Sequence, residues 1–176
     1  MFPFKTEVSI GEKELFEYAD VMGRPRRVFN IIFFGVMLLL ILVTNLLVYF
    51  KTGEVVLWYA ILAAIIAAEF VISLFGRRFA HRRARKMVEK TGVREGFYEF
   101  FEDRLFAEMH DNTSSGTSEF RYSAFVKATE TGNLLLLTLM GRSTLVIPKE
   151  GIGAEQMEAL REALTAAIPG GKYKRK

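Results

Sequence analysis

The chain has no cysteine, and its 176 residues include only two histidines. The absence of cysteine excludes a disulfide framework, thiolate metal sites and a cysteine nucleophile. His81 and His110 are isolated from each other and from paired carboxylates, so they do not form a metal-binding motif. The sequence also has no phosphate-binding Gly-Lys-Ser or Gly-Lys-Thr element before a helix. We therefore expect no cofactor, no metal and no enzymatic activity.

Charge is almost absent from two long apolar runs, residues 31–50 and 55–75. The first run has no Asp, Glu, Lys or Arg, and the second has only Glu69. The hydrocarbon core of a bilayer is ~30 Å thick, so a helix needs about 20 apolar residues to cross it. Each run supplies that length, and the first is not followed by the small-residue cleavage pattern of a secretory signal. The sequence therefore predicts two transmembrane helices that are retained, joined by a turn at residues 51–54.

The orientation of these spans follows from the basic residues beside them. Positively charged loops resist translocation and remain in the cytoplasm. The turn between the runs offers only Lys51, which Glu54 balances. We therefore expect a multi-pass protein of the cell membrane with both termini in the cytoplasm. The flanking cations are Arg24, Arg26 and Arg27 before the first run, and Arg77, Arg78, Arg82, Arg83, Arg85, Lys86 and Lys90 after the second.

Two interpretations are open for the basic segment at residues 77–92, which we expect to continue the second helix. Cations beside a membrane attract anionic headgroups at ~1 kcal/mol per residue, which would make the segment a lipid-binding site. The positive-inside rule alone would make it a topology anchor, the interpretation we favour. Nucleic acid is not an expected partner, because no aromatic stacking motif accompanies the charge. The candidate lipid-binding residues are Arg77, Arg78, Arg82, Arg83, Arg85 and Lys86.

Glu69 is the most conspicuous polar residue inside the predicted membrane spans. A carboxylate in hydrocarbon costs several kcal/mol and usually marks a partner or a pathway. It could be protonated, or it could reach Arg26 or Arg27 near the cytoplasmic end. A stripe of small residues on the same helix would permit close approach of another helix, from a second copy or another membrane protein. The candidate helix-contact residues are Ala60, Ala64, Ala68 and Glu69.

The remaining sequence indicates a cytoplasmic domain of short strands. Residues 2–8 alternate as a strand does, and a helix follows from Ser9 to about Met22, where Gly23 and Pro25 should end it. Later runs rich in Phe, Tyr, Leu and Val, separated by turn residues, indicate antiparallel strands. An amphipathic helix with Met157, Leu160, Leu164 and Ile168 on one face should follow them. The expected strands are residues 97–101, 104–110, 119–122, 124–131, 134–140 and 143–147, and the helix is 154–168.

Several motifs in this region resemble the YcxB-like family of bacterial membrane proteins. They are residues 97–103 (Phe-Tyr-Glu-Phe-Phe-Glu-Asp), Tyr122 with Val126 and Glu130, the run 134–139, and Ile147-Pro148-Lys149. The resemblance implies a domain similar to the pleckstrin-homology and GRAM group, and it implies no catalytic residues. A barrel of that type needs about seven strands, so residues 2–8 could supply one by pairing with an exposed sheet edge.

Together these observations predict an α+β membrane protein with a two-helix transmembrane hairpin and a cytoplasmic, PH/GRAM-like antiparallel β-barrel closed by a C-terminal helix. The expected segments are residues 1–27, 28–76, 77–92, 93–169 and a basic tail at 170–176. We expect a non-enzymatic protein that presents its domain to a protein partner or to anionic membrane lipids, and that could form a homo-oligomer. The alternative is a small subunit or regulator of a transporter or channel that uses Glu69.

Overall fold

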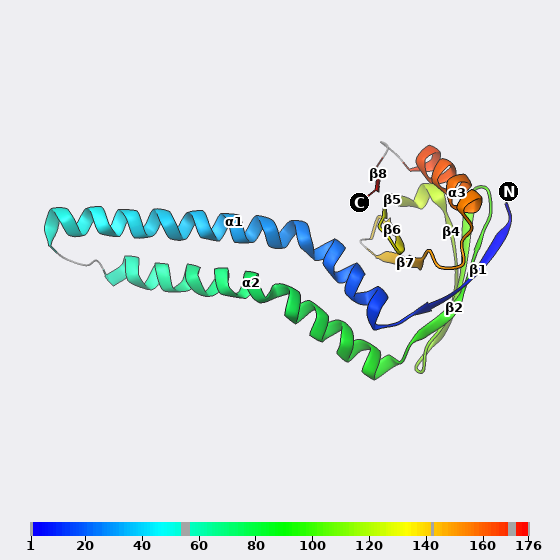
Figure 1. Cartoon of the computed structure of the whole chain (residues 1–176), viewed down its shortest axis with the longest axis horizontal. Helices are drawn as coiled ribbons and strands as arrows, with labels where there is room; N and C mark the ends of the chain where they lie inside the picture. The colour runs from blue at the N-terminus through cyan, green and yellow to red at the C-terminus, as the bar shows by residue number, and fades with distance from the viewer. Residues whose placement is uncertain (1, 54–56, 142, 169–171, 176) are drawn as a thin grey trace. The chain divides into compact units, whose positions relative to one another are not determined.

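Two long helices follow the first strand of the chain (Figure 1). The computed structural model describes residues 2–53, 57–141, 143–168 and 172–175. Helix α1 (Glu12–Thr52) contains the first apolar run, and helix α2 (Leu57–Thr91) contains the second from residue 57 onward. Both are long and apolar enough to cross a membrane, and only 6% of the most apolar 18-residue stretch of each helix is buried. The predicted turn is described as far as Gly53, and residues 54–56 lie outside the described residues.

The chain divides into two compact units, which we call the helical unit and the β-domain. The helical unit is Ala19–Arg83, and the β-domain is Met1–Tyr18 with Ala84–Lys176. In the helical unit, α2 turns Ile66 and Ser73 toward the protein interior, while Ile41 is the buried residue of α1. A Cβ atom placed on Gly35 would lie 3.5 Å from the Phe70 ring, an ordinary van der Waals distance, so α1 and α2 lie close together at this point.

The predicted helix break at Gly23 and Pro25 is wrong, because α1 runs through both residues. Proline removes one backbone donor and leaves the carbonyl of Val21 without its usual helical partner. A single missing bond kinks a long helix more readily than it ends one. The helix of the N-terminal segment and the first apolar run are therefore one element. By contrast, the predicted continuation of the second helix through the basic segment is confirmed, since α2 ends at Thr91.

The β-domain contains a four-stranded antiparallel sheet in the order β1-β2-β3-β4. Its strands are β1 (Phe4–Ile10), β2 (Arg94–Phe100), β3 (Arg104–His110) and β4 (Ser115–Arg121). Strand β1 alternates strictly between buried and exposed residues, as its sequence pattern predicts. It pairs with β2 from Phe4 opposite Phe100 to Ile10 opposite Arg94. The predicted pairing of the N-terminal strand with a sheet edge is confirmed.

The second sheet has the order β7-β6-β5-β8. It contains β5 (Phe125–Glu130), β6 (Leu134–Leu139), β7 (Thr144–Pro148) and a short strand β8 (Tyr173–Arg175) that runs parallel to β5. The predicted closed barrel is therefore wrong, since the described strands form two separate four-stranded sheets. The edge of β5 that could pair with the first sheet is occupied by β8. The strand β8 was missed, because only a basic tail was expected there.

A single hydrophobic core lies between the two sheets and helix α3 (Ala154–Ala167). The predicted inner face of this helix is confirmed, because Met157, Leu160, Leu164 and Ile168 are all buried. A one-turn 3-10 helix (Tyr122–Ala124) connects the sheets where a strand end was expected. The strand expected at residues 119–122 begins earlier, because β4 starts at Ser115. Arg142 and residues 169–171 lie outside the described residues.

Candidate functional site

The basic segment of α2 contains both paired and unpaired cations. Arg77 donates from Nε and Nη2 to the carboxylate of Asp20, at 3.1 and 2.7 Å. The Nε atom of Arg85 lies 3.1 Å from Oε1 of Glu89 and 3.8 Å from Oε1 of Glu12. Within the part of the chain that the structure describes, the other candidate lipid-binding cations have no carboxylate at ion-pairing distance. These are Arg78, Arg82, Arg83 and Lys86.

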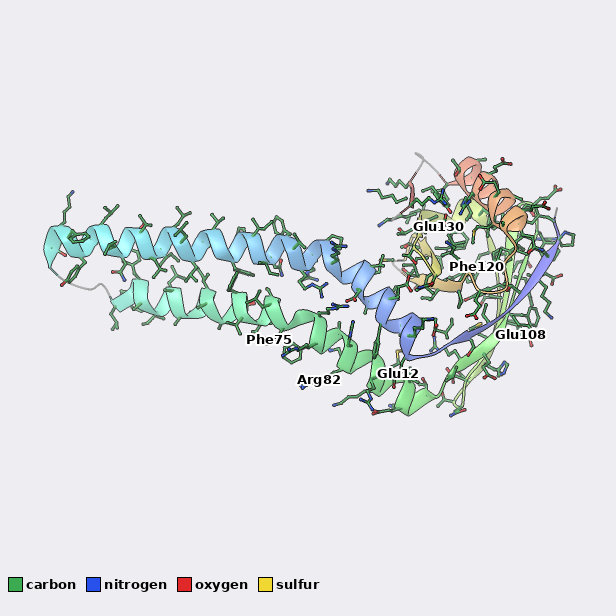
Figure 2. All side chains as sticks on the ribbon, viewed as in Figure 1. Glu12, Phe75, Arg82, Glu108, Phe120 and Glu130 are labelled. Atoms are coloured by element: carbon green, nitrogen blue, oxygen red, sulfur yellow. The ribbon has the colours of Figure 1, made fainter. Side chains whose placement is uncertain are left out.

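The unpaired cations lie on the same side of α2 as two exposed aromatic rings. Residues four apart lie above one another on a helix, and Arg78, Arg82 and Lys86 follow this spacing. Phe75 and Phe79 fall on the same side and are 43% and 51% exposed. In Figure 2, Phe75 and Arg82 point away from α1. We call this surface the basic face, and it consists of Phe75, Arg78, Phe79, Arg82, Arg83 and Lys86.

Asp20 connects α1 to the other side of α2. Besides Arg77, its carboxylate lies 3.2 Å from Nε2 of His81 and 4.0 Å from Nη2 of Arg27. Partial burial raises the pKa of Asp20, but the hydrogen bonds from Arg77 and His81 outweigh burial and hold the pKa below its usual value. Asp20 is therefore ionised at neutral pH. Its contacts turn Arg77 and His81 toward α1 and leave the cations of the basic face free for other partners.

The predicted helix-contact residues of α2 lie outside the contact with α1. All four side chains are exposed: Ala60, Ala64, Ala68 and Glu69. Among the described residues, none forms a hydrogen bond or ion pair with Glu69. Arg27 lies near Asp20 instead of Glu69. The predicted helix-contact role of these four residues therefore stays a prediction.

A second cluster of charged groups lies inside the β-domain around Glu130, the last residue of β5. The Glu130 side chain is only 1% exposed, although it is a carboxylate. Lys149 donates from Nζ at 2.8 Å, Arg161 donates from Nη2 at 2.7 Å and from Nε at 2.9 Å, and the Tyr173 hydroxyl donates at 2.7 Å. We call Glu130, Lys149, Arg161 and Tyr173 the Glu130 cluster.

Hydrogen bonds determine the ionisation of the Glu130 cluster. The bonds from Arg161 lower the pKa of Glu130 most, burial opposes them, and Lys149 and Tyr173 add to the lowering, so the pKa lies well below its usual range. Burial and the Glu130 charge raise the pKa of Tyr173 and keep its hydroxyl protonated as a donor. The cluster joins β5, the segment after β7, α3 and β8. Because its donors are already bound, Lys149 is not a free anion-binding group.

The middle of the β-domain matches a known protein family. Residues 100–164 match the family model described as YcxB-like protein. The match confirms the resemblance inferred from the sequence motifs. It runs from the last residue of β2 to Leu164 in α3 and contains Glu130, Lys149 and Arg161 of the Glu130 cluster. No curated protein and no solved structure matches the chain.

The YcxB-like segment lies after α1, α2 and the basic face in the sequence. The family match therefore describes the β-domain alone. Its motif residues Tyr122 and Glu130 are buried and have structural partners. The Tyr122 hydroxyl donates to the carbonyl of Phe101 at 2.8 Å. These two motif residues thus hold the domain together, and they do not form an exposed site.

Several residues of the basic face and of the Glu130 cluster were not predicted from the sequence. Phe75 and Phe79 could have been found, because their spacing matches that of Arg78 and Arg82 on a helix. Asp20 offers no such signal, since its partner Arg77 is 57 residues away in the chain. Arg161 and Tyr173 were likewise unpredictable, because they reach Glu130 only after α3 and β8 have packed on β5.

Proposed function

We propose that the chain is an integral membrane protein that holds its β-domain at the cytoplasmic surface and binds anionic lipid headgroups through the basic face. In this proposal α1 and α2 span the bilayer, and both termini lie in the cytoplasm. The observation that carries the proposal is the basic face itself. Its unpaired cations and exposed phenylalanines lie on one side of α2, immediately after the apolar part of that helix.

Physical chemistry favours such a surface at the boundary between hydrocarbon and water. Lys and Arg side chains extend their apolar stems along a helix and place their charge among headgroups. Phe75 and Phe79 would bury in the acyl boundary, while Arg78, Arg82 and Arg83 attract anionic lipid at ~1 kcal/mol each. The intramolecular partners of Arg77 and Arg85 make these two cations poorer candidates. The lipid-binding set proposed here is therefore smaller than the set predicted from the sequence.

The β-domain would be a PH/GRAM-like module without catalytic activity. Two packed sheets and a C-terminal helix that covers their core support this proposal. A module of this kind acts by placing a binding surface near the membrane. A protein partner or a second copy of the chain would then meet the β-domain close to the membrane.

Retention of anionic lipid by the full-length protein tests the role of the basic face. The protein would be reconstituted with phosphatidylcholine and phosphatidylserine, extracted gently and examined by native mass spectrometry. A test variant changes Arg78, Arg82, Arg83 and Lys86 to Gln. A charge-matched control changes four exposed cations of the β-domain to Gln, namely Lys13, Arg121, Lys172 and Lys174.

The test variant should retain much less phosphatidylserine than the wild type, and the control should not. At ~1 kcal/mol per cation, four substitutions should weaken binding by about a thousandfold. Equal retention of phosphatidylserine by the test variant and the wild type would contradict headgroup binding and would leave the segment as a topology anchor. An equal loss of phosphatidylserine in the control would show that lipid retention depends on the net charge of the protein and not on the basic face.

A second candidate function is a small subunit or regulator of a transporter or channel. The exposed Glu69 favours it, since no described residue of this chain satisfies its carboxylate. An uncompensated carboxylate in hydrocarbon marks an ion path or a helix partner. Glu69→Gln should abolish ion flux across proteoliposomes while leaving assembly intact if Glu69 serves transport. Loss of assembly on a native gel would instead assign Glu69 to helix contact.

A further inference from the structure

The β-domain contains a cavity of about 340 Å³ between its first sheet and strand β7. Pockets that hold small ligands have volumes of about 300–1,000 Å³. Leu15 from the start of α1 and Met87 and Val88 from the end of α2 also line it. Met87 and the β4 residues Ser115, Gly116 and Ser118 are exposed, so the cavity opens to solvent on this side.

The register of the first sheet explains why the cavity exists. The cross-strand row at one end of its inner face is bulky, with Phe4, Phe100, Leu105 and Phe120. Phe120 reaches the second sheet, where its ring centre lies 6.0 Å from that of Phe125. The next row is Thr6, Tyr98, Ala107 and Ser118, and the third is Val8, Gly96, Met109 and Gly116. Side-chain volume therefore decreases along the face and leaves the cavity open.

The larger part of the cavity wall is apolar and adaptable. Ile10, Leu145 and Val146 supply aliphatic surface, and Met87 and Met109 lie on two different sides of it. Methionine has a flexible, polarisable side chain and fits ligands of irregular shape. An aliphatic chain is the ligand that such a wall accommodates best, because it gains burial of apolar surface without needing directed hydrogen bonds.

The charged groups that line the cavity already have partners within the protein. Arg94 donates from Nε to Asp111 at 3.2 Å, and the Tyr98 hydroxyl donates to the carbonyl of Val146 at 3.2 Å. His110 lies 4.0 Å from Glu95. Burial raises the pKa of Tyr98 to about 12, so its hydroxyl stays neutral. A charged ligand would have to compete with these internal partners for its counter-charge and would lose hydration on entering.

Free polar groups occur at the mouth of the cavity. The hydroxyls of Ser115 and Ser118 make no hydrogen bond to another described residue. Hydroxyl groups donate to and accept from an ester or an alcohol. The cavity thus combines an apolar interior with an uncharged hydrogen-bonding mouth.

We propose that this cavity binds an uncharged lipid with a single aliphatic chain and a hydroxyl or ester head, as in a monoacylglycerol. The chain lies against Met109, Leu145 and Val146, and the head lies at Ser115 and Ser118. This inference rests on the proposed membrane location, which brings such lipids to the β-domain. It assigns the domain a second lipid site, distinct from the basic face in position and in ligand charge.

Photolabelling of the full-length protein in phosphatidylcholine proteoliposomes tests the proposal. The probe is a monoacylglycerol with a diazirine in its acyl chain, and labelled peptides are identified by mass spectrometry. Ser118→Phe fills the cavity from β4. Thr117→Phe is the matched control, because the neighbouring residue on the same strand points to the opposite face of the sheet. Labelling of α1 and α2 by probe dissolved in the bilayer serves as the internal reference.

In the wild type, peptides from β3, β4 and the end of α2 should be labelled in addition to the two spans. Ser118→Phe should reduce labelling of β3 and β4, relative to the spans, by about tenfold, because the aliphatic chain loses its buried surface. Thr117→Phe should leave that ratio unchanged. An excess of monoolein should compete, and an equal excess of the oleate anion should not.

Three results would overturn the proposal. They are unlabelled β-domain peptides beside labelled spans, an undiminished ratio in Ser118→Phe, and competition by oleate equal to that by monoolein. Absence of label from α1 and α2 in protein that does not float with the liposomes would instead contradict the proposed membrane location. The experiment therefore separates failure of the cavity assignment from failure of the function on which it rests.

Discussion

The helical unit and the β-domain place the same residue types in opposite environments. In the helical unit, large apolar side chains such as Leu39, Leu47 and Trp58 are exposed, at 62%, 62% and 77%. In the β-domain, Leu135, Leu136 and Leu137 are 0% exposed, and even the carboxylate of Glu130 is buried. The β-domain buries its large apolar side chains by itself, whereas the helical unit leaves many of its own exposed. This difference is the physical basis of the proposed membrane location.

The largest effect should come from the buried charge of the β-domain. Glu130→Gln removes the negative charge shared by Lys149 and Arg161, and loss of one partner from a buried ion pair costs about 3–5 kcal/mol. The free energy of unfolding of the β-domain should fall accordingly in denaturant titrations of the full-length protein. The control is Glu158→Gln, which removes the exposed partner of Arg161 and should cost under about 1 kcal/mol. Equal effects of the two substitutions would contradict the structural role of Glu130.

Acid should weaken the same cluster. Its bonds hold the pKa of Glu130 below the unfolded value of about 4.3, so the unfolded chain binds the proton more tightly. The contribution of Glu130 to stability is therefore complete above that value and is lost as the pH falls below it. Between pH 7 and pH 3 the wild type should lose more stability than Glu130→Gln. Parallel pH profiles of unfolding would show that Glu130 has the same pKa in the folded and the unfolded protein, which would contradict its stabilisation by the cluster.

A smaller effect should come from close backbone packing within the first sheet. A Cβ atom on Gly96 would lie 2.0 Å from the carbonyl oxygen of Glu108, a distance that requires the backbone to move. Gly96→Ala should lower the free energy of unfolding by about 1–3 kcal/mol, as overpacking does. Gly132→Ala is the control, because a Cβ atom there meets no other atom within 4 Å. Thermal unfolding of both variants by near-ultraviolet circular dichroism would compare the two positions.

The smallest effect should come from the ion pair of the helical unit. Asp20→Asn removes the charge that binds Arg77, and a partly exposed pair contributes about 0–1 kcal/mol. The contact between α1 and α2 should loosen near this end, and the β-domain should keep its stability. Spin labels on single cysteines at Arg24 and Ala80 would report the distance distribution. An unchanged distribution in Asp20→Asn would show that apolar packing alone holds the helices.

Elements with a short-range sequence pattern were predicted correctly. Features that depend on contacts between distant segments of the chain were not. The two apolar runs, the alternating strand at the N-terminus and the inner face of α3 each follow a short-range period. Continuity of α1 through Pro25 was missed, because a local breaker was given more weight than the helical turns on either side. The pairing of β8 with β5 was missed as well, since three residues carry too short a pattern to indicate a strand.

The sequence predicted which basic residues belong to the candidate site, but it did not predict which of them have partners within the protein. Counting cations located the basic segment but could not separate Arg77 and Arg85, which have carboxylate partners, from Arg78, Arg82 and Arg83. That separation depends on Asp20, which approaches only when α1 packs against α2. The cavity was not predicted either. The small side chains that leave it open come from different strands, and they form cross-strand rows only when the strands pair in register.

The most direct test of the account is the environment of the exposed apolar side chains in the helical unit. Because the chain has no cysteine, a single cysteine at Leu39 can carry a spin label without other substitutions. A second label at Thr117, on the exposed outer side of β4, is the reference. Accessibility to oxygen and to a water-soluble nickel chelate would be compared in proteoliposomes.

If the helical unit lies in the membrane, the Leu39 label should be accessible to oxygen and protected from the nickel chelate, as expected for a side chain in hydrocarbon. The Thr117 label should show the reverse order. Accessibility of the Leu39 label to the nickel chelate equal to that of Thr117 would place α1 in water and would contradict the central claim that the helical unit lies in the membrane.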